Sequence, residues 1–234
     1  MLQCATAARV SRTRNGASDP PALATAGAIP GQWLFRAEVK TASGSGSLRL
    51  VLRRFDASRF TLSASDALGQ ARWEIRSDGI EAVWLEPEAH RFCRLDARRA
   101  LRTPQWVSSI SVADIAGLLT GEWPPEDALA PPPVPPESPA PPASGLQRIT
   151  GDRAQERWTN WTLWEGSEPL VWFKRLGTDS LLSARQPAVQ FRWRLTARGG
   201  LGDLGNLNGG AFVLLPGQIT ARAREIACPD NAIP

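Results

Sequence analysis

Strict alternation of apolar and polar residues recurs in five consecutive segments between residues 32 and 85, and this pattern limits the fold most. A repeat of two belongs to β-strands, whose successive side chains point to opposite faces of a sheet. Turn-forming stretches such as Ser-Gly-Ser-Gly at 43–46 and Ser-Asp-Gly at 77–79 separate the segments. One face of each segment is apolar and the other is charged. The pattern therefore predicts an antiparallel meander that buries one face.

The residues predicted to share the buried face are large and apolar. They are Trp33, Phe35, Leu48, Leu50, Phe60, Leu62, Trp73 and Trp84. A one-residue shift of register would turn all of them outward, so we expect them on the same concave side.

The spacing changes to that of a helix after residue 111. Val112, Ile115, Ala116 and Leu119 follow the i, i+3, i+4, i+7 pattern of an apolar helix face. Ser111 with Asp114 has the spacing of a capping box, and Gly121 suits the end of the helix.

One short helix is small beside a sheet that carries so many large apolar side chains. The sequence therefore predicts an α+β, mainly β fold: a curved antiparallel sheet forming a half-open barrel, with a short helical lid over an apolar cavity. Ile115 and Leu119 are the lid residues expected to face that cavity. The alternative is that the tryptophans simply fill the interior.

Further alternating segments after residue 145 are too few to close a second core, so we expect both halves to complete one sheet. Residues 1–30 are predicted to be a disordered leader or tether, and 31–226 a single domain. Residues 126–144 are predicted to be a proline-rich inserted loop, because proline lacks the donor that a sheet needs. Residues 227–234 are predicted to be a tail.

Residue types that support familiar catalysis or metal binding are scarce. His90 is the single histidine of the chain, and the three cysteines, Cys4, Cys93 and Cys228, form no CxxC pair. We expect no catalytic residue, no metal site and no cofactor. The net charge is only +4, and the arginines alternate with other residues along strands, so we expect no nucleic-acid partner. A binder of anionic polymers and an enzyme without a cofactor are the less favoured functions.

Four segments resemble the LolA/LolB family of bacterial lipoprotein carriers and receptors when taken in order. These are the opening strand 31–37, the strand–turn–strand 59–70, the helix 115–124, and the late basic and apolar strand 189–194. The resemblance covers residues 31–125 closely and 145–226 loosely. Departures are Ala67 in place of the proline of the family's Pro-Leu-Gly turn, the proline-rich insertion and a longer end.

The resemblance implies a half-open β-barrel whose apolar cavity holds the acyl chains of lipoproteins without catalysis, for lipoprotein localisation at the outer membrane. The cavity positions would be the ten apolar residues named above for the sheet and the lid. Leu68 occupies the place of the leucine that inserts into the membrane or assists transfer in the receptor branch. The implied partners are lipoprotein acyl chains or other lipids, a periplasmic carrier protein and the membrane surface, with this chain a monomer. A structural envelope lipoprotein is the alternative function.

Two questions about the cysteines stay open at the level of sequence. Cys4 resembles the lipid-modified first residue of a mature lipoprotein, although only three residues precede it here and Gln3 is unfavourable before such a cysteine. It is either lipidated, with the start of the chain further upstream, or an ordinary cysteine. Cys93 and Cys228 either form a disulfide in an oxidising periplasm or remain two buried thiols. The expected location is the periplasmic face of the outer membrane or the soluble periplasm.

Overall fold

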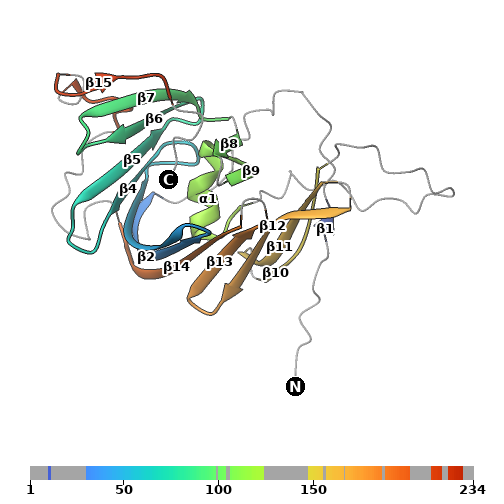
Figure 1. Ribbon diagram of the computed structural model, residues 1–234. Coiled ribbons are helices and arrows are strands. Elements are labelled where there is room, and N and C mark those ends of the chain that lie inside the picture. Colours follow the sequence, from blue (N-terminus) through green and yellow to red (C-terminus); the bar gives the residue numbers. More distant parts are fainter. Residues whose placement is uncertain are drawn as a thin grey trace.

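A computed structural model describes residues 10–11, 30–98, 100–103, 106–123, 147–154, 157–165, 167–185, 188–200, 212–217 and 221–228. One open, curved sheet of thirteen strands dominates this part, and a short helix lies within its curve (Figure 1). The predicted mainly β fold with a curved, open antiparallel sheet is thereby confirmed. The predictions for residues 1–9, 12–29 and 126–144 fall outside the described residues, and so does Cys4.

Two antiparallel meanders make up most of the sheet. The first consists of β2 (Gly31–Thr41), β3 (Gly44–Arg54), β4 (Phe60–Ser65), β5 (Ala71–Ser77), β6 (Glu81–Glu86) and β7 (Arg91–Asp96). The second consists of β10 (Gln147–Ala154), β11 (Arg157–Glu165), β12 (Glu168–Leu176), β13 (Asp179–Ala184) and β14 (Val189–Gly199). The edges are extended by β1 (Val10–Ser11) beside β10 and by β15 (Arg224–Glu225) beside β7.

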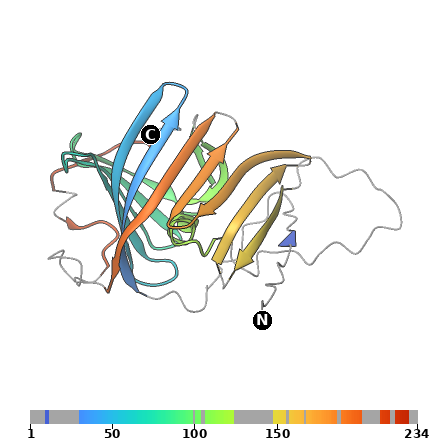
Figure 2. The same cartoon turned by 90° about the horizontal axis from the view of Figure 1, so that it is seen from below.

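The last strand of the second meander, β14, pairs with the first strand of the first, β2. Trp193 lies opposite Ala37 and Phe191 opposite Val39, so the apolar faces of the two meanders are continuous. Figure 2 shows the two long strands side by side, β14 in orange and β2 in blue. The expectation that both halves complete one sheet is met in the described residues.

The inner face of the sheet, which we define as the face toward the helix, carries the main apolar cluster. Neighbouring strands are in register, so Phe35, Leu50 and Ala64 form one row across β2, β3 and β4. A second row begins with Trp33 and Leu52 and continues through Leu62. Side chains of the same parity on each strand therefore meet on one side, as the alternation requires.

The helical segment begins as a 3-10 turn, η1 (Val112–Asp114), and continues as α1 (Ile115–Thr120). The Asp114 carboxylate accepts hydrogen bonds from the Ser111 amide at 3.3 Å and from the Ser111 hydroxyl at 2.7 Å. Gly121 ends α1 with φ of +80°, a left-handed conformation that suits glycine. The short strands β8 (Ala100–Thr103) and β9 (Trp106–Ser111) lead into this segment as a separate two-stranded sheet.

A C-terminal strap, residues 212–217 and 221–228, covers the outer face of β6 and β7. Its Leu214, Leu215 and Ala223 pack against a second, smaller cluster formed by Val83, Leu85 and Phe92. The strap also supplies β15, which runs parallel to β7 and covers the backbone of that edge strand.

We name the two ends of the curved sheet by the residues found there. The Leu68 end carries the turns between β2 and β3, between β4 and β5 and between β6 and β7. The Arg54 end carries the turns between β3 and β4 and between β5 and β6.

Candidate functional site

All ten residues predicted for the cavity belong to one apolar cluster between the sheet and α1. Those at most 5% exposed are Trp33, Phe35, Leu50, Phe60, Leu62, Trp84 and Leu119. Leu48, Trp73 and Ile115 are half-buried and pack against the same cluster. Because seven of these side chains are at most 5% exposed and pack against one another, an acyl chain beneath α1 requires them or α1 to move.

The second meander adds an aromatic series that sequence reasoning did not assign to the site. Trp123 packs edge-on against Trp161 at 4.8 Å between ring centroids, and Trp161 stacks on Phe173 at 5.6 Å. Phe173 contacts Trp193 at 5.8 Å, and Trp193 contacts Phe191 at 5.1 Å. Alternation within 170–173 does signal a two-faced strand, but apolar residues occupy both faces there. Only the structure shows that Phe173 points inward and Trp172 outward, 38% exposed.

Three polar links hold α1 and the residues after it to the sheet. The Trp193 indole N–H donates to the Leu119 carbonyl at 3.2 Å. The Trp158 backbone amide donates to the Gly121 carbonyl at 3.3 Å. The Arg54 guanidinium pairs with the Glu122 carboxylate. The links attach only the last turn of α1 and the residues that follow it.

The inner face is less completely covered at the Leu68 end. Leu48 on β3, Trp73 on β5 and Phe191 on β14 are half-buried there and contact the cluster with one side of each side chain. Trp73 stacks on Trp84 with 5.0 Å between the ring centroids. These side chains form an apolar rim, which we define as Leu48, Trp73 and Phe191.

Leu68 lies beyond this rim, at the tip of the turn between β4 and β5, and is 85% exposed. Asp66 shapes the turn, because its carboxylate accepts hydrogen bonds from the amides of Leu68 at 2.9 Å and Gln70 at 3.0 Å. Gly69 follows with φ of +81°. Desolvation raises the Asp66 pKa, but hydrogen bonds from Gln70, Arg72 and Leu68 outweigh it and leave the pKa lowered. The turn is thus held by Asp66 and backbone amides, and the exposed Leu68 side chain does not contribute to it.

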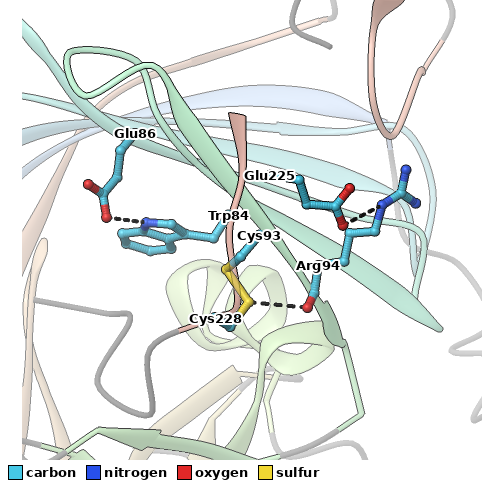
Figure 3. The surroundings of a disulfide bond; sticks show 6 residues. All are labelled: Trp84, Glu86, Cys93, Arg94, Glu225 and Cys228. Carbon is cyan, nitrogen blue, oxygen red and sulfur yellow. Dashed lines mark hydrogen bonds and ion pairs between the residues drawn. A yellow bond between two sulfur atoms is a disulfide. The ribbon is translucent and has the colours of Figure 1, made fainter. Parts of the chain in front are cut away.

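Cys93 on β7 and Cys228 in the strap form a disulfide (Figure 3). Of the two possibilities that the sequence left open, the structure therefore has the paired one. Arg94 forms an ion pair with Glu225 of β15 at 3.4 Å, and Cys228 Sγ lies 3.1 Å from the Arg94 carbonyl oxygen. On the other side of Cys93, the Trp84 indole N–H donates to Glu86 at 3.3 Å. The disulfide thus ties the strap to the strand that borders the apolar cluster.

Within the described ranges, no group of three or more histidine, cysteine or acidic side chains is placed to hold a metal ion. None of the helices described here is long and apolar enough to cross a membrane.

No family model matches the sequence, and no curated protein matches it. Among solved structures, a LolA superfamily protein from Nitrosomonas europaea is similar over 73% of this chain and 86% of its own, with 11% identity and a TM-score of 0.45. A putative outer membrane lipoprotein-sorting protein domain from Vibrio parahaemolyticus is similar over 79% of this chain and 90% of its own, also at 11% identity and 0.45. A DUF1329 family protein from Desulfovibrio piger is similar over 78% of this chain and 89% of its own, with 6% identity and a TM-score of 0.45.

At these identities the solved structures assign no role to any residue of this chain. The similar structures include a LolA superfamily protein and a lipoprotein-sorting domain, from the family that the sequence resembles.

Proposed function

We propose that this protein binds the acyl chains of lipoproteins or of other lipids between the inner face of its sheet and α1, without catalysis, for lipoprotein localisation at the outer membrane. The observation that carries the proposal is the imbalance between the two layers. A large, aromatic-rich inner face is covered by a helix of only six residues, together with Ile110, Val112 and Trp123 on either side of it. A permanent second layer is normally matched to the apolar face that it buries.

The free energies permit an acyl chain to displace α1. Burying one methylene stabilises by about 0.8 kcal/mol, so a chain of about 14 methylenes contributes about 11 kcal/mol. Exposing the side chains of Leu118 and Leu119 costs about 1.5–3 kcal/mol each. Each hydrogen bond between α1 and the sheet contributes about 1 kcal/mol. Loss of the Arg54–Glu122 pair adds about 1–3 kcal/mol, so the costs sum to about 6–11 kcal/mol and the gain is at least comparable with them.

The apolar rim supports entry of the chain at the Leu68 end. Leu48, Trp73 and Phe191 already contact the cluster on one side and solvent on the other. An acyl chain that replaces this solvent buries apolar surface before α1 has to move. Leu68, exposed beyond the rim, is proposed to contact the membrane or the cargo during transfer.

The disulfide supports an oxidising compartment such as the periplasm, because disulfides persist there and are rare in the cytosol. We propose the periplasmic face of the outer membrane, with Cys4 lipidated, or the soluble periplasm. A periplasmic carrier protein is the proposed partner.

Binding of dansyl-undecanoic acid, followed by energy transfer from tryptophan, tests the proposal. Trp73→Ser removes one wall of the rim and is expected to weaken binding about tenfold. Trp172→Ser is the matched control, because Trp172 is also partly exposed but lies on the outer face. Its loss is expected to leave the affinity for the dansyl acid unchanged.

Native mass spectrometry of protein purified from a bacterial host without detergent is the second measurement, and co-purified acyl lipid is the expected result. Failure of the protein to bind the dansyl acid, before and after removal of lipid, would contradict the proposal. Loss of binding in Trp172→Ser but not in Trp73→Ser would also contradict it.

A further inference from the structure

Two arginines converge beside the C-terminal end of α1. Arg175 belongs to the last residues of β12 and Arg157 begins the antiparallel strand β11, so both lie at the same end of these neighbouring strands. The Arg175 guanidinium lies against Gly121, where any Cβ would collide with it. Gly121 is in turn bound through its carbonyl by the amide of Trp158, the residue after Arg157. The contacts place the Arg175 guanidinium and the backbone beside Arg157 at the same residue, and the charge of Arg157 is close enough to act on Arg175.

This pair of cations lacks an acidic partner. In the described part of the chain, no carboxylate is within ion-pair distance of Arg175 or Arg157. The nearest acidic residue along the chain from Gly121 is Glu122, and its carboxylate pairs with Arg54. Burial lowers the pKa of Arg175, and the positive charge of Arg157 lowers it further. Two like charges on neighbouring strands disfavour the fold unless an anion lies between them.

Capping of α1 does not account for Arg175. The carbonyls at the end of the helix are already bound by other donors: Ala116 by the Thr120 hydroxyl, Gly117 by the amides of Glu122 and Trp123, Leu118 by the amide of Gly121, and Leu119 by the Trp193 indole. These four carbonyls therefore do not depend on the Arg175 guanidinium for a hydrogen-bond donor.

A buried donor nearby also lacks an acceptor. Trp161, 1% exposed, stacks on Phe173, two residues before Arg175 on the same face of β12. Its indole N–H has no hydrogen-bond partner among the described residues. A buried donor without an acceptor costs about 1–3 kcal/mol. This corner of the inner face thus holds more donors than acceptors, as a site for an anion does.

We infer that Arg157 and Arg175, beside Gly121, bind the phosphate or carboxylate group of an amphiphile whose chain lies along the inner face. The lengths agree, because Arg175 and the rim residue Leu48 lie on one row across five strands, through Ser180, Trp193 and Ala37. Four strand spacings of about 4.8 Å separate them by about 19 Å along the sheet. That is about the length of an extended chain of 16 carbons. The chain part of this inference rests on the proposed function, whereas the anion site does not.

Calorimetric titration with three probes tests the inference: dodecyl phosphate, dodecyl maltoside and inorganic phosphate, with both detergents below their critical micelle concentrations. The wild-type protein is expected to bind dodecyl phosphate at least tenfold more tightly than dodecyl maltoside. The Arg157→Gln/Arg175→Gln variant is expected to lose that preference and to keep its affinity for the maltoside. Arg36→Gln/Arg49→Gln is the matched control, because these exposed arginines also face each other on neighbouring strands.

The outcomes separate the two proposals. Equal affinity for both detergents in the wild type, or a preference that survives the double substitution, overturns the anion site and leaves the proposed function standing. Binding of inorganic phosphate alone, lost in the double variant, supports the anion site and contradicts the proposed function. Binding of no probe overturns both. If the double variant is unstable, Arg157→Gln alone is tested for loss of the preference for dodecyl phosphate. Arg157 is exposed, so this substitution does not disturb the core.

Discussion

The guanidinium of Arg54, with its side chain only 4% exposed, pairs with the carboxylate of Glu122, two residues beyond α1. The pair joins β3 to the chain that leaves the helix, across 68 residues of sequence. Arg54 also donates from Nε to the Asp56 carbonyl at 3.1 Å, so its charge has two partners. A buried cation on the inner face thereby becomes an attachment for the lid.

Replacing Glu122 by glutamine is expected to lower the free energy of unfolding by about 1–3 kcal/mol. Removing one partner of a fully buried ion pair costs about 3–5 kcal/mol, and the partial exposure of Glu122 reduces this. Urea denaturation measures the change. Glu88→Gln is the control, because Glu88 pairs with Arg72 on the surface at 3.1 Å and its loss is expected to change stability by less than about 0.5 kcal/mol. Equal effects of the two substitutions would contradict the role given to Arg54.

The alternation along β3 contains the signal for the buried arginine of this pair. Arg54 follows Leu50 and Leu52 at intervals of two, so it belongs to the inner face and interrupts an otherwise apolar series. Its partner is not predictable in the same way, because the pairing depends on where α1 crosses the sheet. Local patterns determine the face of a residue, whereas contacts between distant segments depend on the whole fold.

The first meander and the second differ in how far the sequence predicts them. In β2 to β5 most outer positions are polar, with Leu34 and Val51 as exceptions, so alternation identifies the inner face. In β12 both faces carry aromatic residues, Phe173 inside and Trp172 outside, and alternation alone cannot tell them apart. The disulfide between Cys93 and Cys228 spans 135 residues and follows from the path of the strap, which no local pattern indicates.

Removal of the disulfide is expected to release the strap and leave the inner cluster intact. The bond closes a loop of 135 residues in the unfolded chain, for which the loss of chain entropy corresponds to about 4–5 kcal/mol of stability. In Cys93→Ser/Cys228→Ser, the amides of Arg224 and Ile226 should exchange hydrogen much faster. They donate to the carbonyl of His90, just before β7, at 2.8 Å and to that of Phe92 on β7 at 2.9 Å. The amides of β3 should exchange hydrogen as slowly, relative to one another, as they do in the wild type. Unchanged exchange at Arg224 and Ile226 would show that β15 holds without the bond.

Asp56 is expected to contribute a pH-dependent part of the stability. Desolvation raises its pKa, but hydrogen bonds from Arg59 and Ser58 outweigh this and lower the pKa from 3.8 to about 2. A carboxyl whose pKa is lower in the folded state stabilises the fold above its unfolded pKa, and this contribution is lost as the pH falls from about 4 to about 2. The side chain is 37% exposed, so solvent screening reduces the contribution to about 1 kcal/mol. Asp56→Asn should be less stable than the wild type by that amount at pH 7. The difference should vanish near pH 2, and a constant difference across this range would contradict the assignment.

Leu68 is expected to matter for transfer and not for folding. Because it is exposed at the tip of a turn that Asp66 holds, Leu68→Glu and Leu68→Ala should each change the free energy of unfolding by less than about 0.5 kcal/mol. Binding to vesicles of phosphatidylethanolamine and phosphatidylglycerol should nevertheless fall in Leu68→Glu, because a carboxylate must lose its water to enter that interface.

Ile80→Glu is the matched control for this prediction. Ile80 is also an exposed apolar residue in a turn, 63% exposed, but it lies at the Arg54 end of the sheet. The same charge placed there should leave vesicle binding unchanged, which separates the position of Leu68 from a general effect of net charge. If both substitutions weaken binding equally, Leu68 has no special contact with the membrane. Loss of a buried leucine costs about 2–5 kcal/mol. If both Leu68 variants lose that much stability, the side chain supports the core and its proposed part in transfer is wrong.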